Sequence, residues 1–232
     1  MNRLVLVAEM TGRDLWRRRA VLGLLAVVPL AFYLARRDST GLAVRFLSLG
    51  LAWAISTAAL FSSNAAKGVE RRLRLGGYRA GELYLGRLSA VAAIGTVLAL
   101  AYFALVVVDQ ELSRNGTVLL SLLLTVAVAA PLGTLISAVT PRDLEGTLVL
   151  ITTIGLQFLI DPAQSYAKLL PFWSNRELAT YAVDMTDAGY LWRGVTHAVC
   201  YAVVLATATA AMTLVRLRRR RHIRVVAASG SR

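Results

Sequence analysis

The stretch LSAVAAIGTVLALAYFALVVV (residues 88–108) decides the fold class, because it carries no charged residue over its whole length. A helix of about 20 apolar residues crosses the ~30 Å hydrocarbon core of a bilayer. The rest of the chain repeats the pattern, with long apolar blocks between short blocks that hold most of the charge. Charged residues make up only 17% of the chain, below the share in a soluble domain. The sequence therefore predicts an all-α polytopic integral membrane protein.

Working outward from this stretch gives about six predicted spans in a single domain, residues 1–232. The other apolar blocks lie at residues 20–35, 42–62, 117–139, 147–160 and 195–215. The block at 42–62 is rich in Ser, Gly and Ala, which favours a packed interior position. The block at 147–160 is short for a full crossing.

Two segments outside the spans have their own character. Residues 1–19 place Leu4, Val7 and Leu15 on one helical face with charged residues opposite, which is typical of an interfacial amphipathic helix. A frayed tail is the alternative. Residues 161–193 are rich in aromatic side chains and too polar to cross, so we expect short re-entrant or interfacial helices there, on the outer side.

The distribution of basic residues predicts the orientation. Lys and Arg concentrate in residues 1–19, in 63–87, at Arg142 and in the tail 216–232, which are alternate connections between the spans. The positive-inside rule places these segments in the cytoplasm. We therefore expect a multi-pass protein of the cell (inner or plasma) membrane with both termini cytoplasmic. The net charge of +13 then reflects contact with bilayer headgroups, and no nucleic-acid partner is expected.

No catalytic motif occurs in the sequence. It lacks the phosphate-binding pattern G-x-x-x-x-G-K-S/T, the zinc pattern H-E-x-x-H and the nucleophile pattern G-x-S-x-G. We therefore expect no enzyme activity, no cofactor and no metal on this chain. A function that needs energy would take it from another protein.

Residues 63–87 are the most informative polar block. Val69 and Leu73 can share one side of a helix, and Gly76-Gly77 is a helix stop signal. Glu82 fits the first turn of a second helix, where a carboxylate suits the dipole. The block predicts a helix–break–helix that feeds directly into the span at 88–108, a shape suited to a groove on a cytoplasmic partner.

The same block resembles the cytoplasmic loop of ABC-2 type transporter permeases. The likeness lies in Gly68-Val69-Glu70-Arg71-Arg72-Leu73, Arg79-Ala80-Gly81-Glu82-Leu83 and Leu85-Gly86-Arg87. Residues 131–138, the sequence Pro141-Arg142-Asp143 and the overall layout are similar to that family as well. Gly76-Gly77-Tyr78 departs from it, because the family usually has a proline-containing break there.

The resemblance implies the permease subunit of an ATP-driven exporter. Such an exporter pairs two permeases, identical or paralogous, with two ATP-binding subunits that hold the ATP and Mg. The residues expected to couple to the ATP-binding subunit are Val69, Glu70, Leu73, Arg79, Glu82 and Leu83. Leu73 and Leu83 are the expected docking anchors, as leucines in a charged setting. The export substrate is not identified.

Arg45 is the one Lys or Arg inside a predicted span. It can extend to the outer headgroups or contact substrate, and with Phe172 and Trp173 it forms the candidate translocation path or outer gate. A non-transporting membrane anchor, scaffold or sensor subunit is the alternative function. An intramembrane enzyme is a third, which the missing catalytic motifs disfavour.

Overall fold

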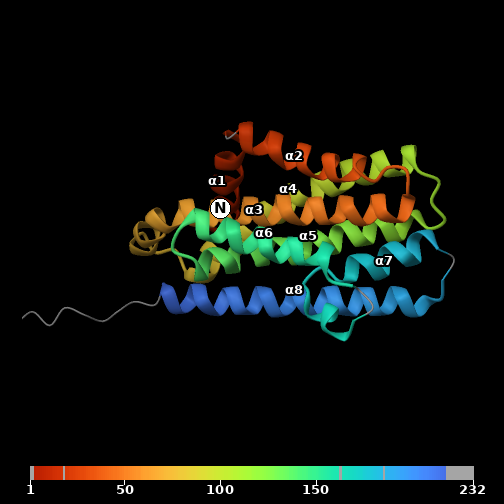
Figure 1. Cartoon of the computed structure of the whole chain (residues 1–232). Coiled ribbons are helices and arrows are strands. Elements are labelled where there is room, and N and C mark those ends of the chain that lie inside the picture. Colours follow the sequence, from red (N-terminus) through yellow and green to blue (C-terminus); the bar gives the residue numbers. More distant parts are fainter. Residues whose placement is uncertain (1–2, 18, 162–163, 185, 218–232) are drawn as a thin grey trace, which may run out of the picture.

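The computed structural model describes residues 3–17, 19–161, 164–184 and 186–217, and this part of the chain is all-helical (Figure 1). The elements in order are α1 (Arg3–Arg17), α2 (Arg19–Leu34), α3 (Thr40–Leu75), α4 (Ala80–Asp109), α5 (Asn115–Val139), α6 (Asp143–Leu159), the 3₁₀ turn η1 (Ser165–Leu169), α7 (Ser174–Val183) and α8 (Ala188–Arg216). The all-α prediction is confirmed for the described residues.

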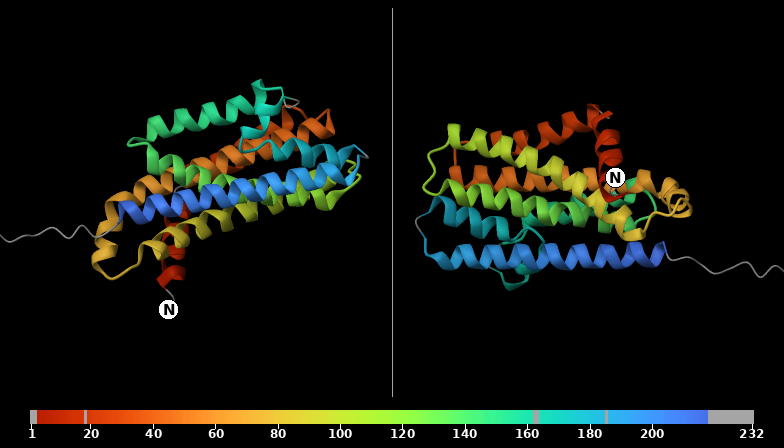
Figure 2. Two further views of the ribbon diagram at one scale, coloured as in Figure 1. Left: turned by 90° about the horizontal axis from the view of Figure 1, so that it is seen from below. Right: turned by 180° about the vertical axis from the view of Figure 1, so that it is seen from behind.

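Four helices, α3, α4, α5 and α8, are long and apolar enough to cross a membrane, which indicates a membrane-embedded protein. They lie roughly along one axis, and the views in Figure 2 agree with Figure 1 on this arrangement. Helices α2 and α6 coincide with predicted spans. With 16 and 17 residues, they are shorter than the four long helices. Helix α1 lies across the ends of the other helices (Figure 1).

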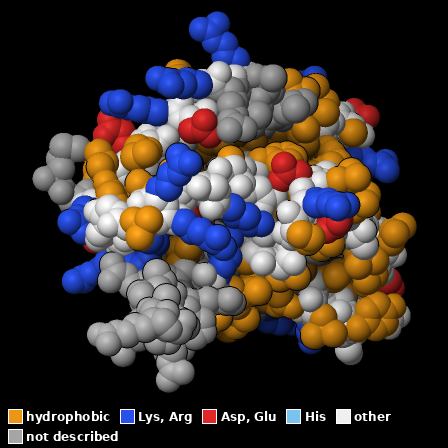
Figure 3. All heavy atoms as spheres, turned by 90° about the vertical axis from the view of Figure 1, so that its left-hand side faces the viewer, with side chains coloured by type: hydrophobic (Ala, Val, Ile, Leu, Met, Phe, Trp, Pro, Cys, Tyr) orange, Lys and Arg blue, Asp and Glu red, His pale blue; other side chains and the backbone are white. Residues whose placement is uncertain are grey.

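The bundle has two chemically different ends. The break between α3 and α4, the turn between α5 and α6, and the end of α8 share one end, which we call the basic end (Figure 1). Figure 3 looks onto this end and shows Lys and Arg side chains spread across it. The opposite end, here the distal end, carries the connections between α2 and α3, α4 and α5, and α7 and α8 (Figure 1).

Helix α3 is the centre of the bundle, as its small residues predicted. Leu47, Leu51 and Ile55 on it are fully buried. It packs most extensively on α5 and α2. Helix α5 approaches so closely that a side-chain carbon on Gly133 would stand 2.0 Å from the backbone oxygen of Ser56. Close helix contact through small residues is how membrane helices gain packing energy.

Two helices extend well beyond the predicted spans that they contain. Residues 42–62 and 65–75 belong to one uninterrupted helix, α3, because no residue between them breaks the helix. The last span was expected to start at 195, but α8 starts at Ala188, inside the segment 161–193. The Asp187 side chain accepts a hydrogen bond from the Gly189 backbone N–H at 2.7 Å and starts α8 there.

We expect Gly133→Ala to destabilise the bundle, because its new methyl group would collide with the backbone of Ser56. Overpacking of this kind costs about 1–3 kcal/mol. Gly155→Ala on α6 is the control, since no atom lies within 4 Å of the added carbon. Thermal unfolding of the purified proteins in detergent compares the two. Equal midpoints would contradict the close α3–α5 contact.

Candidate functional site

The predicted helix–break–helix is present at the basic end. Helix α3 stops at Leu75, and Gly77 adopts a left-handed φ of 88°, which favours glycine. The Tyr78 N–H donates to the Leu73 carbonyl at 3.1 Å, and the Gly77 N–H donates to the Arg74 carbonyl at 3.2 Å. This pair of hydrogen bonds is a Schellman motif. The break therefore has a defined shape without the proline that the ABC-2 family usually has.

Helix α4 begins three residues after the left-handed glycine, at Ala80. The Glu82 carboxylate accepts a hydrogen bond from the Arg79 backbone N–H at 2.7 Å. Glu82 thus caps the helix in its first turn, as predicted, and the negative charge suits the positive end of the helix dipole. Arg79 itself is exposed beside the break.

Glu70 lies in the interior, with only 2% of its surface exposed. Its carboxylate accepts a hydrogen bond from Arg87 at 2.6 Å and a second, charge-assisted one from Arg216. These partners come from α4 and α8, so one side chain of α3 joins three helices. Glu70 was expected among the residues that couple to a partner. Because Glu70 is buried, its ion pairs hold the loop in position from within the bundle.

A second set of contacts ties α3 to the end of α5. The Lys67 ammonium donates hydrogen bonds to the carbonyl oxygens of Ser137 at 2.7 Å and Thr140 at 3.2 Å. A cation at the C-terminal end of a helix is favoured by the helix dipole. The Ser137 hydroxyl in turn donates to the Asn64 side chain at 2.6 Å. Two polar sets on α3, this one and the ion pairs of Glu70, therefore tie α3 to α4, α5 and α8.

The expectation that Leu83 is an exposed docking residue is wrong. Only 1% of its surface is exposed, because it packs in an apolar cluster with Val7 of α1 and Leu217 beyond α8. Leu73 is half-buried against the same cluster. The apolar side chains that do reach solvent on this loop are Val69, Leu85 and above all Leu75, which is 86% exposed. Leu75 escaped the prediction because the loop motif does not include it.

The second predicted group comes together in the distal half of the bundle. Arg45, Phe172 and Trp173 line one small hollow of about 10 Å³. Gln157 of α6 and Arg176 of α7 line it as well, and neither was predicted. The Arg45 guanidinium donates to the Gln157 backbone carbonyl at 3.2 Å. Since 112 positions separate these two residues, no local spacing could have revealed the pair.

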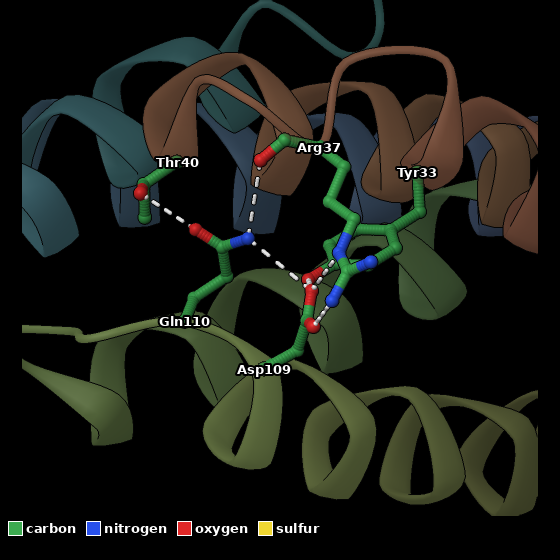
Figure 4. Close-up of polar contacts among 5 residues, drawn as sticks. All are labelled: Tyr33, Arg37, Thr40, Asp109 and Gln110. Atoms are coloured by element: carbon green, nitrogen blue, oxygen red, sulfur yellow. Dashed lines mark hydrogen bonds and ion pairs between the residues drawn. The ribbon is translucent and has the colours of Figure 1, made fainter.

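Figure 4 shows a separate polar cluster at the distal end, where the α2–α3 turn meets the end of α4. Arg37 donates to the Asp109 carboxylate, with its Nε at 3.0 Å, and the Tyr33 hydroxyl donates to the same carboxylate. The Thr40 hydroxyl donates to the Gln110 side chain at 2.7 Å. The bond to Asp109 raises the pKa of the Arg37 guanidinium. Because Arg37 and Asp109 pair with each other, this cluster fastens the turn.

The described residues contain no group of three or more His, Cys, Asp or Glu side chains that could hold a metal ion. The sequence matches no protein-family model and no curated protein. The likeness to ABC-2 permeases therefore remains a resemblance carried by local motifs. Function has to be inferred from the geometry of the two ends.

We expect Glu70→Gln to destabilise the protein by about 3–5 kcal/mol, because it leaves the buried Arg87 without its partner. The matched control is Glu9→Gln, which breaks an exposed pair with Arg13 on α1. An exposed pair of this spacing contributes about 0.3–0.5 kcal/mol. Thermal unfolding in detergent measures both.

A double variant separates lost charge balance from lost packing. Glu70→Met combined with Arg87→Met removes both buried charges, and Arg216 can turn toward solvent. We expect the double variant to recover most of the stability that Glu70→Gln loses. If Glu70→Gln unfolds at the wild-type temperature, the carboxylate does not hold these helices together.

Proposed function

We propose that this chain is the permease subunit of an ATP-driven ABC-2 type exporter, and that residues 63–87 contact a separate ATP-binding subunit. The supporting observation is that α3 and α4 are both longer than a membrane crossing needs, and that the break joins their extended ends. At 1.5 Å per residue, the 36 residues of α3 and the 30 of α4 measure about 54 and 45 Å. Both exceed the ~30 Å hydrocarbon core.

Such extensions suit the transmission of force from a partner to the membrane. A push on the break acts on α3 and α4 directly. It also acts on α8 through Glu70 and Arg216, and on α5 through Lys67. Hydrogen-bonded charges make these junctions stiff.

The contact surface for the ATP-binding subunit is best assigned to the exposed apolar residues of the loop. Leu75 lies at the last position of α3, immediately before the break, with Val69 and Leu85 exposed on either side of it along the chain. Interface energy concentrates in a few central residues. In this proposal, Leu75 touches the partner, while Glu70 and Leu83 keep the loop in shape.

The proposal includes a full topology. The basic end faces the cytoplasm, α2 and α6 cross with the four longer helices, and η1 and α7 enter from the outer side. The apolar faces of α4 and α8 are largely unburied within the chain. They are available to lipid and to a second permease, identical or paralogous, with which the translocation path would be formed.

We expect Leu75→Asp to abolish copurification of the ATP-binding subunit and export, while membrane insertion persists. A charge in a desolvated contact costs about 2–4 kcal/mol, within the range for interface hot spots. Val108→Asp is the control, because that apolar side chain is about as exposed but lies at the distal end of α4, away from the loop and from the hollow around Arg45. The measurement is a pull-down of the tagged full-length chain from its native membranes, with copurified ATPase activity as the readout. Unchanged ATPase binding by Leu75→Asp would remove the loop from the proposed interface.

Cysteine labelling tests the proposed orientation. In a Cys200→Ser background, Arg72→Cys places a thiol at the exposed basic end and Ser113→Cys places one at the exposed distal end. A membrane-impermeant thiol reagent should label position 113 in intact cells and position 72 only after permeabilisation. The reverse pattern would invert the topology.

A further inference from the structure

The hollow in the distal half of the bundle has an unusual polar lining. Three separate elements contribute to it: α3 with Arg45, α6 with Gln157, and α7 with Arg176. Every polar side chain among them can donate hydrogen bonds, and both charges are positive. The volume of about 10 Å³ is the space of one water-sized group.

Gln157 supplies an unused donor. The residue is only 4% exposed, yet its side-chain Nε2 has no hydrogen-bond partner within the described structure. Buried amide donors are nearly always paired, because an unpaired one forfeits its hydrogen bonds to water. An unpaired donor on a hollow indicates that the partner is a molecule from outside the chain.

The two arginines reinforce this conclusion. Among the described side chains, no carboxylate forms an ion pair with Arg45 or Arg176, and Glu177 beside the latter pairs with Arg193 at 3.0 Å. The positive charge of Arg176 repels the positive charge of Arg45. Arg176 also lies in the first turn of α7, where the helix dipole disfavours a cation. The like charges, the cation at the start of a helix and the unpaired amide each disfavour the folded state. Such a combination of unfavourable features is typical of a functional site.

We propose that Arg45, Gln157 and Arg176 bind the phosphate of an anionic amphiphile. One phosphate oxygen fits the hollow and accepts the Gln157 hydrogen bond, while the other oxygens face the two guanidinium groups. Planar guanidinium groups match phosphate with paired hydrogen bonds. A carboxylate has only two oxygens and can be satisfied by a single arginine, so two convergent arginines favour phosphate.

The surroundings indicate an amphiphile rather than a soluble phosphate. The other residues around the hollow are apolar, among them Leu49, Ile160 and Leu170. The adjoining turns of α6 expose Leu156 and Leu159. Arg45 is the sixth residue of α3, about 8 Å from the start of this spanning helix, and the ends of spanning helices lie near the lipid headgroups. The phosphate can therefore enter the hollow while its chain lies along α6.

Native mass spectrometry of the purified full-length chain tests the site, with phosphatidylglycerol and phosphatidylcholine offered in equal amounts. We expect wild-type protein to retain phosphatidylglycerol preferentially. Arg45→Gln and Arg176→Gln should each weaken its binding about tenfold, as for a lost hydrogen bond to a charged group. Arg36→Gln is the control, since it removes an exposed positive charge near the same end but outside the hollow. It should bind like wild type.

Gln157→Met distinguishes a built site from general attraction by positive charge. It changes no charge and nearly keeps the side-chain volume. We expect it to weaken phosphatidylglycerol binding severalfold, yet to raise the unfolding temperature of the lipid-free protein because the unpaired donor is gone. Arg45→Lys, which keeps the charge without the paired hydrogen bonds, should bind between wild type and Arg45→Gln. It serves in place of Arg45→Gln if that variant does not fold.

Two outcomes would overturn the proposal. If phosphatidylglycerol binding survives in Gln157→Met and in both Arg→Gln variants, the lipid is held by general surface charge. If inorganic phosphate at the same concentration displaces the lipid, the acyl chain contributes nothing and the ligand is not an amphiphile. The assay uses this chain without an ATP-binding subunit, so its result does not depend on the exporter proposal.

Discussion

The buried carboxylate of Glu70 is the constraint on which the basic end of the bundle depends. A charge in a low-dielectric interior is strongly unfavourable unless it is paired and hydrogen-bonded. Arg87 of α4 and Arg216 of α8 can reach Glu70 only if each helix has one particular axial shift and one rotation about its axis relative to α3. The ion pairs therefore fix three helices at once, including the two that flank the break between α3 and α4.

The two clusters of arginine in this chain obey the same physics with opposite results. At the basic end, Arg87 and Arg216 share a carboxylate, and the charges stabilise the framework. In the distal half, Arg45 and Arg176 lie near each other with no carboxylate paired to either in the part of the chain that is described. The first arrangement holds the fold together. The second arrangement destabilises the fold, and this favours a ligand-binding role for Arg45 and Arg176.

Local signals in the sequence predicted the features that depend on local physics. The stop at Gly76-Gly77 and the Glu82 cap were correct, since each is set by hydrogen bonds within a few residues. The burial of Leu83 and the partnership of Glu70 with Arg216 were not predictable in this way. That ion pair joins residues 146 positions apart, and only the packing of α8 against α5 and α4 brings them together. The same reason explains why Gln157 and Arg176 were missed.

Helix α3 connects the two regions physically. Arg45 lies near its distal start and Glu70 near its basic end, about 37 Å apart along a helix with no proline. Sharp kinks arise mostly at proline or where a group is inserted, so a continuous helix without proline can carry a displacement along its length. The tight contact of Gly133 with Ser56 also resists bending at its middle. In the proposed exporter, a displacement applied to the loop at Leu75 would be carried along α3 toward Arg45, while α6 and α7 carry the other donors of the hollow. The two proposals, force on the loop and ligand binding in the distal half, would then be linked through one helix.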